Sequence, residues 1–170
     1  MLPELFRSLL ARDLRALARE VEAYPSDDLL WRTVPGIPNS GGTLVLHLLG
    51  NLQHFVGAVL GRTGYVRDRD AEFATRDLTR AELLRRIEVA RASVDATLAQ
   101  LDQERCEAEY PVPVAGRTLG TADFLAHLAA HLAYHLGQID YHRRLLVPGA
   151  VTVDAMSISE LPGTQATRVR

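Results

Sequence analysis

All six histidines of the sequence fall in two stretches, residues 43–60 and residues 121–147. In the second stretch His131 and His135 stand four residues apart, which places their imidazoles about 40° apart on a helix that turns about 100° per residue. Such a pair can ligate a metal ion when a third imidazole comes from a neighbouring helix. The spacing therefore predicts a divalent metal site with at least one coordination position open to water or substrate.

Both stretches carry a polar face that borders a stripe of leucines, so the imidazoles are expected at the edge of a core. An unpaired buried imidazole costs on the order of 1–3 kcal/mol, and a shared metal would satisfy several together. The polar faces consist of His47, Asn51 and His54 in the first stretch and of His127, His131, His135, Gln138 and His142 in the second.

Imidazole ligands suit zinc, nickel, iron and copper alike. The histidines that are not ligands, His54, His127 and His142, are interpreted as groups beside the metal, facing a substrate or on the surface. Gln138 and Asn51 are expected to orient ligands by hydrogen bonds. In the opposing interpretation the site is vestigial and the histidines only hydrogen-bond to one another.

Four amphipathic segments, recognised by apolar residues at three- and four-residue spacing, must position these side chains. They are expected at residues 2–24, 43–60, 79–102 and 121–147. Thr79 followed by Glu82 predicts the N-terminal cap of the third helix, and Thr121 is expected to cap the fourth. The pattern predicts an all-α four-helix bundle, and the periodicity is compatible with more than one order of its helices.

The connections differ in composition. Residues 25–42 are rich in proline and glycine, and Trp31 is expected to anchor this loop to the core. The charged run 67–72 is interpreted as a solvated loop, and residues 109–119 as a short extended or hairpin-like excursion. The lone cysteine, Cys106, is interpreted as incidental rather than nucleophilic.

Length and composition indicate one globular domain. The chain has 170 residues, a formal net charge of −2 and 47% hydrophobic residues. Its basic residues alternate with acidic ones, which argues against nucleic-acid binding. Polar residues interrupt the apolar stretch 43–60, which favours a core helix over a membrane span. We expect a bundle domain over residues 1–150 and a partly mobile tail over 151–170.

The single cysteine and the N-terminal residues bear on location. One cysteine forms no intrachain disulfide, and the first ten residues lack the pattern of a signal peptide. A cytoplasmic protein is therefore expected.

The fourth segment carries a motif, His-Leu-Ala-Tyr-His-Leu-Gly-Gln at residues 131–138, that resembles the His-x-x-x-His-x-Gly-Gln signature of the DinB-like (YfiT-like) superfamily. The second segment, with His-Leu-Leu-Gly-Asn-Leu-Gln-His at residues 47–54, looks like a subgroup of it. The resemblance implies a bundle of up-down-down-up order with a long crossover between helices two and three, and a homodimer.

Carried over to this sequence, the resemblance implies His47, His131 and His135 as the metal ligands. Leu136 stands where the family usually has arginine, which leaves the ligands untouched. Relatives include thiol-dependent S-transferases and a mycothiol-dependent isomerase, and many members have no known reaction. The resemblance therefore implies a metal site more firmly than an activity.

Two classes of function follow. In the first, an enzyme acts on a small-molecule substrate, and zinc, nickel or iron lowers the pKa of a low-molecular-weight thiol or of water to create a nucleophile. Arg67, Arg69 or the remaining histidines would recognise an anionic cofactor, and a hydrolase would use His54 as general base. In the second, a non-catalytic stress-response protein binds a metal that mainly supports the fold.

Overall fold

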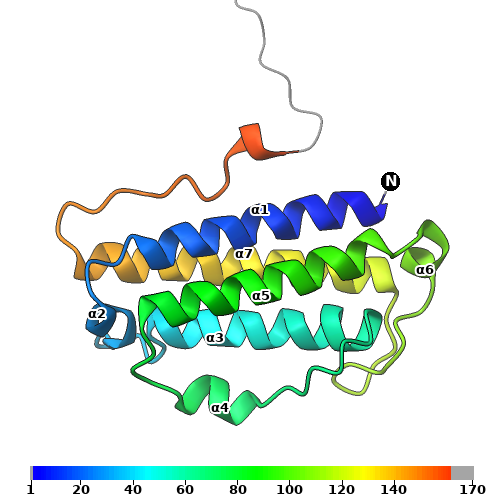
Figure 1. The fold of residues 1–170 in the computed structure, drawn as a ribbon, viewed down its shortest axis with the longest axis horizontal. Coiled ribbons are helices and arrows are strands. Elements are labelled where there is room, and N and C mark those ends of the chain that lie inside the picture. The colour runs from blue at the N-terminus through cyan, green and yellow to red at the C-terminus, as the bar shows by residue number, and fades with distance from the viewer. Residues whose placement is uncertain (1, 162–170) are drawn as a thin grey trace, which may run out of the picture.

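The computed structural model describes residues 2–161, and every regular element in that range is a helix. Short helices occupy the connections between longer ones (Figure 1). The long helices are α1 (Leu2–Glu22), α3 (Gly41–Leu52) with its continuation η1 (Gln53–Leu60), α5 (Arg80–Ala99) and α7 (Thr121–Leu146). The short ones are α2 (Asp27–Trp31), α4 (Arg69–Ala74), α6 (Gln103–Glu107) and η2 (Ile158–Glu160). The predicted all-α fold is confirmed.

The long helices pack side by side around a leucine-rich core. Helix α1 contacts α5 and α7, and α3 contacts the same two helices. Figure 1 shows that α3 and α5 both run from left to right, whereas α1 and α7 run from right to left. Because α3 and α5 point the same way, the chain has to return along the molecule between them. Residues 61–79, which include α4, make that return.

Helix α3 begins at Gly41, where the Ser40 hydroxyl accepts a hydrogen bond from the Thr43 amide at 3.2 Å. It changes from α to π geometry at Gln53 and ends at Leu60. This helix is long and apolar enough to cross a membrane, but 72% of its most apolar window is buried inside the protein. That burial is what a core helix requires.

The two expected helix caps have different outcomes. Thr79 caps α5, since its hydroxyl accepts from the Glu82 amide at 3.2 Å, as predicted. Thr121 does not cap α7. It is the first helical residue, with Gly120 at the cap position, and its amide donates to the carbonyl of Ala108 at 2.9 Å. The start of α7 is therefore held by a backbone hydrogen bond to the preceding loop, and no side chain caps it.

The loops are anchored by specific contacts. Trp31 is buried and its indole donates to the Leu78 carbonyl at 2.8 Å, which confirms its expected role. Isolated antiparallel bridges Glu109–Gly120 and Val114–Arg117 give residues 109–120 the expected hairpin-like course.

The described part of the C-terminal tail runs back along α1 (Figure 1). Arg19 donates to the carbonyls of Val153 and Asp154 and pairs with Glu160 at 3.0 Å. The last part of the tail predicted to be mobile, residues 162–170, lies outside the described residues.

Candidate metal site

The three histidines His47, His131 and His135 meet between α3 and α7. The Nε2 atom of His131 lies 3.3 Å from Nε2 of His47 and 3.1 Å from Nε2 of His135. One ligand atom from each residue lies within 4.8 Å of the other two. A tetrahedral zinc ion with Zn–N bonds of about 2.0–2.1 Å separates neighbouring nitrogens by about 3.3–3.4 Å. The observed spacing fits a metal ligated by imidazoles.

The outer ring nitrogens of two of these histidines are held by oxygen atoms. His47 Nδ1 lies 3.1 Å from Oε2 of Glu72, and His135 Nδ1 lies 2.7 Å from Oε1 of Gln138. A carboxylate or amide oxygen accepts hydrogen bonds, so each Nδ1 carries the proton and each Nε2 turns a lone pair toward the common centre. This is the tautomer that binds a metal through Nε2.

The fit can be tested by counting hydrogen atoms among the three Nε2 atoms. His131 Nε2 lies between the other two, and a proton on it can be donated to only one of them. If the three histidines only hydrogen-bonded to one another, His131 Nε2 would donate to one neighbour. The other neighbour's Nε2 would then face His131 Nε2 with no hydrogen atom between the two nitrogens. A single cation satisfies all three nitrogens, which is why the donor set fits a metal better than it fits the vestigial interpretation.

Burial keeps His131 and His47 in the neutral form that metals bind. Burial, with His135 and His47 close by, lowers the pKa of His131 to about 4. Burial also lowers the pKa of His47, although the hydrogen bond to Glu72 opposes that shift. The His47 side chain is only 12% exposed. Near pH 7 these two imidazoles are therefore uncharged, so a metal does not have to displace a second ring proton.

Glu72 is a site residue that sequence reasoning misses, because the run 67–72 is interpreted as a solvated loop. That interpretation is wrong for the side chains of Glu72 and Arg67. Arg67, a candidate for recognising an anionic cofactor, is bound to Glu72. Arg67 donates from Nε to Glu72 Oε1 at 2.7 Å and from Nη2 to Oε2 at 2.8 Å, and Glu72 is 6% exposed. Arg67 Nη2 also lies 3.4 Å from His47 Nδ1, but its shorter contact is with the carboxylate.

A sequence signal for this arrangement does exist. Phe73 follows Glu72 directly and packs its ring 5.2 Å from that of His47. Asp68 caps α4 by accepting from the Ala71 amide at 2.9 Å. A capping residue followed by an aromatic side chain is typical of a short helix that lies against a core, whereas a solvated loop needs neither.

The remaining histidines have separate environments. His127 is exposed and stacks on His131 with ring centroids 6.2 Å apart. His54 packs on Phe55 at 4.8 Å, and among the described residues no hydrogen bond or ring contact joins it to the three central histidines.

His142 is buried and both of its ring nitrogens are bonded away from the three central histidines, so its interpretation as a surface group or as a group beside the metal is wrong. Its Nδ1 pairs with the Tyr24 hydroxyl at 2.7 Å and its Nε2 with the Arg32 carbonyl at 2.8 Å. Gln138 orients a ligand as expected. Asn51 does not, because its buried Oδ1 has no hydrogen-bond partner within the described residues.

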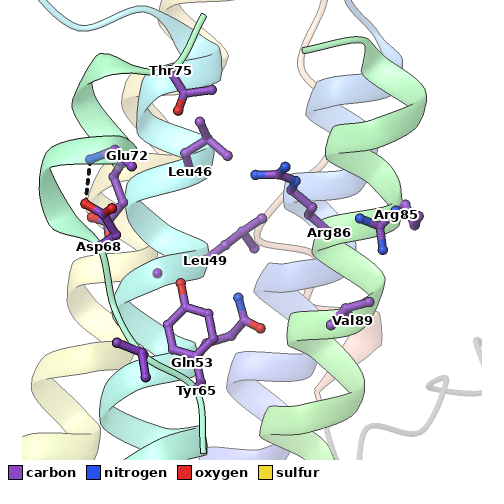
Figure 2. A pocket seen from close by; sticks show the side chains of 13 residues that line it. Leu46, Leu49, Gln53, Tyr65, Asp68, Glu72, Thr75, Arg85, Arg86 and Val89 are labelled. Atoms are coloured by element: carbon purple, nitrogen blue, oxygen red, sulfur yellow. Dashed lines mark hydrogen bonds between the residues drawn. The ribbon is translucent and has the colours of Figure 1, made fainter.

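A cavity of about 310 Å³ lies behind Glu72, between α3, α4 and α5. Figure 2 shows Leu49 of α3 and Arg86 of α5 facing each other across it, with Glu72 on the α4 side. Within the described part of the chain the three central histidines do not line this cavity. Glu72 therefore separates it from His47, and the cavity is not the approach to the open side of the site.

The fold and the site together define the class of protein: it is an all-α protein with a three-histidine candidate metal site between two long helices. The family model of the DinB superfamily matches residues 9–139, which include all three histidines and Gln138. The chain belongs to the DinB superfamily. It has no significant match among curated proteins or among solved structures.

Proposed function

We propose that the protein binds one divalent transition metal, zinc, nickel or iron, through Nε2 of His47, His131 and His135, and uses it as an enzyme that transfers a low-molecular-weight thiol to a small-molecule substrate. The observation that carries this proposal is the convergence of three Nε2 atoms, with the tautomers of His47 and His135 set by Glu72 and Gln138. A metal bound by three imidazoles keeps a position open and lowers the pKa of a thiol or of water that occupies it.

The environment of Cys106 supports an external thiol. This residue is the single cysteine of the sequence, and it is buried in α6. Burial raises the pKa of its thiol, so the chain's own sulfur is a poor nucleophile. In a thiol-transfer reaction at the three histidines, the reacting thiol would therefore come from a second molecule.

The position of His54 argues against its role as general base in the hydrolytic alternative. His54 follows His47 by seven residues, which is about 10 Å along a helix axis, whereas a general base must lie within about 3 Å of the proton that it removes. In either reaction the metal itself would have to supply the nucleophile, by lowering the pKa of a bound thiol or of bound water.

The core argues that the metal does more than support the fold. Leu48, Leu52 and Leu132 are fully or almost fully buried beneath the site, and they belong to one continuous apolar cluster. A bundle with such a core does not need a metal as a staple. We therefore favour an active metal over the non-catalytic, fold-supporting alternative.

We further propose that the protein acts in the cytoplasm as a homodimer. Tyr134 and Leu145 on α7 are more than half exposed, as side chains of a self-association surface are in a single chain. Light scattering at two protein concentrations measures the oligomeric state directly, and a monomer at both would contradict the dimer.

Elemental analysis of protein purified without an affinity tag tests metal binding. We expect about one equivalent of metal in the wild type and loss of most of it in His47→Ala, His131→Ala and His135→Ala, because a two-imidazole remnant binds weakly. His127→Ala is the matched control, since His127 lies on the same helix and stacks on His131 without belonging to the central three.

The same variants decide between an active and a structural metal. His135→Ala should keep the far-ultraviolet circular dichroism of the wild type while losing turnover in a panel of low-molecular-weight thiols with a chromogenic electrophile. Collapse of the helical signal would favour the structural role. Failure of the wild type to retain zinc, nickel or iron after reconstitution would overturn the metal site itself.

A further inference from the structure

A second cavity, of about 320 Å³, lies between the loop before α3, the first turn of α3 and the C-terminal half of α7. Leu44 of α3 lines it and precedes His47 by three residues, while Gln138 of α7 lines it and follows His135 by three. Three residues span about 4.5 Å along a helix axis, so the cavity begins about one turn from the proposed metal on both helices. A molecule in the cavity would therefore lie about one helical turn from His47 and His135.

The walls of this cavity are mostly apolar and carry no charge. Ile37, Pro38, Leu44 and Tyr141 supply apolar surface, and the polar side chains of the lining include the amides of Asn39 and Gln138. Within the described residues the lining includes no lysine, arginine, aspartate or glutamate. A charged ligand would therefore meet no opposite charge in this cavity. Burial of the apolar surface of an uncharged ligand, by contrast, is favourable by roughly 25 cal/mol per Å².

The buried His142 at the edge of the cavity does not change this character. Both of its ring nitrogens are committed, to the Tyr24 hydroxyl and to the Arg32 carbonyl. A carbonyl only accepts, so Nε2 carries the proton and Nδ1 accepts from the tyrosine, which leaves a neutral ring. His142 therefore offers the cavity carbon atoms and no free donor or acceptor.

The loop that closes one side of the cavity is held in place. The Ile37 amide donates to the Val34 carbonyl at 2.8 Å across a tight turn, in which Gly36 has a φ of +81° that most side chains disfavour. Ile37 is 38% exposed, which is unusual for an isoleucine in an ordered turn. A ligand in the cavity would cover part of that apolar surface.

Gln138 connects the cavity with the metal site. Its Oε1 is occupied by His135 Nδ1 at 2.7 Å. In the part of the chain that the structure describes, its NH₂ group makes no hydrogen bond, and Gln138 lines the cavity. The cavity thus presents one free amide donor at the end nearest the histidines.

We infer that this cavity binds an uncharged, largely apolar small molecule that carries a hydrogen-bond acceptor at one end, with the acceptor on the amide of Gln138. The inference rests on the proposed function in one respect: the molecule would be the acceptor substrate that lies beside the metal.

Binding of 2-naphthol, an uncharged aromatic alcohol, tests the cavity independently of the metal. Ligand-observed nuclear magnetic resonance measures its affinity for full-length protein treated with a chelator. We expect Tyr141→Ala and Ile37→Ser to weaken binding by about fivefold or more, through loss of apolar contact. Tyr134→Ala is the matched control, because Tyr134 is 65% exposed and Tyr141 is 67% exposed on the same helix, but only Tyr141 lines the cavity.

Three results would overturn the cavity as a site for uncharged ligands. They are no measurable binding of 2-naphthol, equal affinities in the wild type and the Tyr141→Ala and Ile37→Ser variants, and tighter binding of the anion 2-naphthoate than of 2-naphthol. Both substituted side chains are partly exposed, and circular dichroism verifies that the variants fold.

A paramagnetic metal tests the link to the histidines. With cobalt bound in place of zinc, the protons of 2-naphthol should relax faster than in the zinc-loaded protein, because the two sites are within about 10 Å. No difference in relaxation with stoichiometric cobalt bound would overturn the role of the cavity as substrate site. Failure of the wild type to bind any metal would instead contradict the proposed function. The binding of 2-naphthol to chelator-treated protein would still show whether the cavity is a binding site.

Discussion

Two oxygen atoms outside the ligand set decide what the three histidines can do. Oε2 of Glu72 and Oε1 of Gln138 fix the protons on His47 and His135, so that both Nε2 atoms face the centre. Without these acceptors each ring could rotate or change tautomer, and the entropy of fixing it would oppose metal binding. Arg67 in turn holds Glu72 in one orientation through two hydrogen bonds.

Replacing Glu72 measures this contribution. Glu72→Ala should lower metal affinity by about 10- to 100-fold, whereas Glu72→Gln should lower it less because its amide oxygen can still accept from His47 Nδ1. Competition with a chromophoric chelator measures the affinity. Asp70→Ala, an exposed substitution on the same helix, is the control. If Glu72→Ala binds metal as tightly as Asp70→Ala, the carboxylate does not orient the ligand.

At the scale of elements, the site depends on how closely α4 approaches α3. Gly50 of α3 lies under Glu72, and a Cβ atom built at Gly50 would overlap the carboxylate oxygen Oε1. The absence of a side chain at this position therefore lets Glu72 reach His47. A glycine inside a helix costs about 1 kcal/mol relative to alanine, and the close approach of α4 gives a physical reason for it here.

Two glycine substitutions should have opposite effects. Gly137→Ala should stabilise the protein by up to about 1 kcal/mol, because alanine favours the helix and nothing lies within 4 Å of the added Cβ. Gly50→Ala should destabilise the protein and weaken metal binding, since α4 must shift to relieve the overlap. Urea unfolding and metal titration measure both effects. Equal stabilisation by the two substitutions would show that Glu72 does not need the space over Gly50.

At the scale of the whole molecule, buried polar groups join segments that are distant in sequence. His142 of α7 is hydrogen-bonded to Tyr24, which follows α1, and to Arg32, which follows α2. Arg143 beside it pairs with the fully buried Glu20 of α1 at 2.7 Å. These contacts fix the end of α7 against α1 and the loop before α3, and so the part of the second cavity that His142 lines.

His142 should make stability depend on pH. Burial lowers the pKa of His142 below its ordinary value of 6.5, so below that value the unfolded chain binds a proton that the folded chain does not. The free energy of unfolding should therefore fall as pH decreases from about 7.5 to about 5.5, by at most about 1.4 kcal/mol per pH unit from this residue.

The variant His142→Asn isolates this contribution, because asparagine does not titrate. It should be less stable than the wild type by about 1–3 kcal/mol at neutral pH, and the difference should shrink as pH falls. Urea unfolding in the presence of a chelator measures it, with the central histidines contributing alike to both proteins. A difference that stays constant with pH would mean that His142 is not held neutral in the fold.

The sequence by itself determined the features that depend on near neighbours along the chain. Apolar spacing located the long helices, and the four-residue spacing of His131 and His135 placed both on one face of α7, because helix geometry fixes such positions locally. Thr79 and Glu82 likewise located the start of α5. The motif at residues 131–138 already indicated the family to which the chain belongs.

Only the tertiary structure decided which distant side chains meet. His47 and His131 are 84 residues apart and His47 and Glu72 are 25 apart, and those contacts depend on how α3, α4 and α7 pack. Periodicity placed His142 on the same face as the ligands, yet the end of α7 lies against α1 and the loop before α3, which buries His142. Sequence spacing specifies where a side chain points from its own helix, and helix packing specifies what lies there.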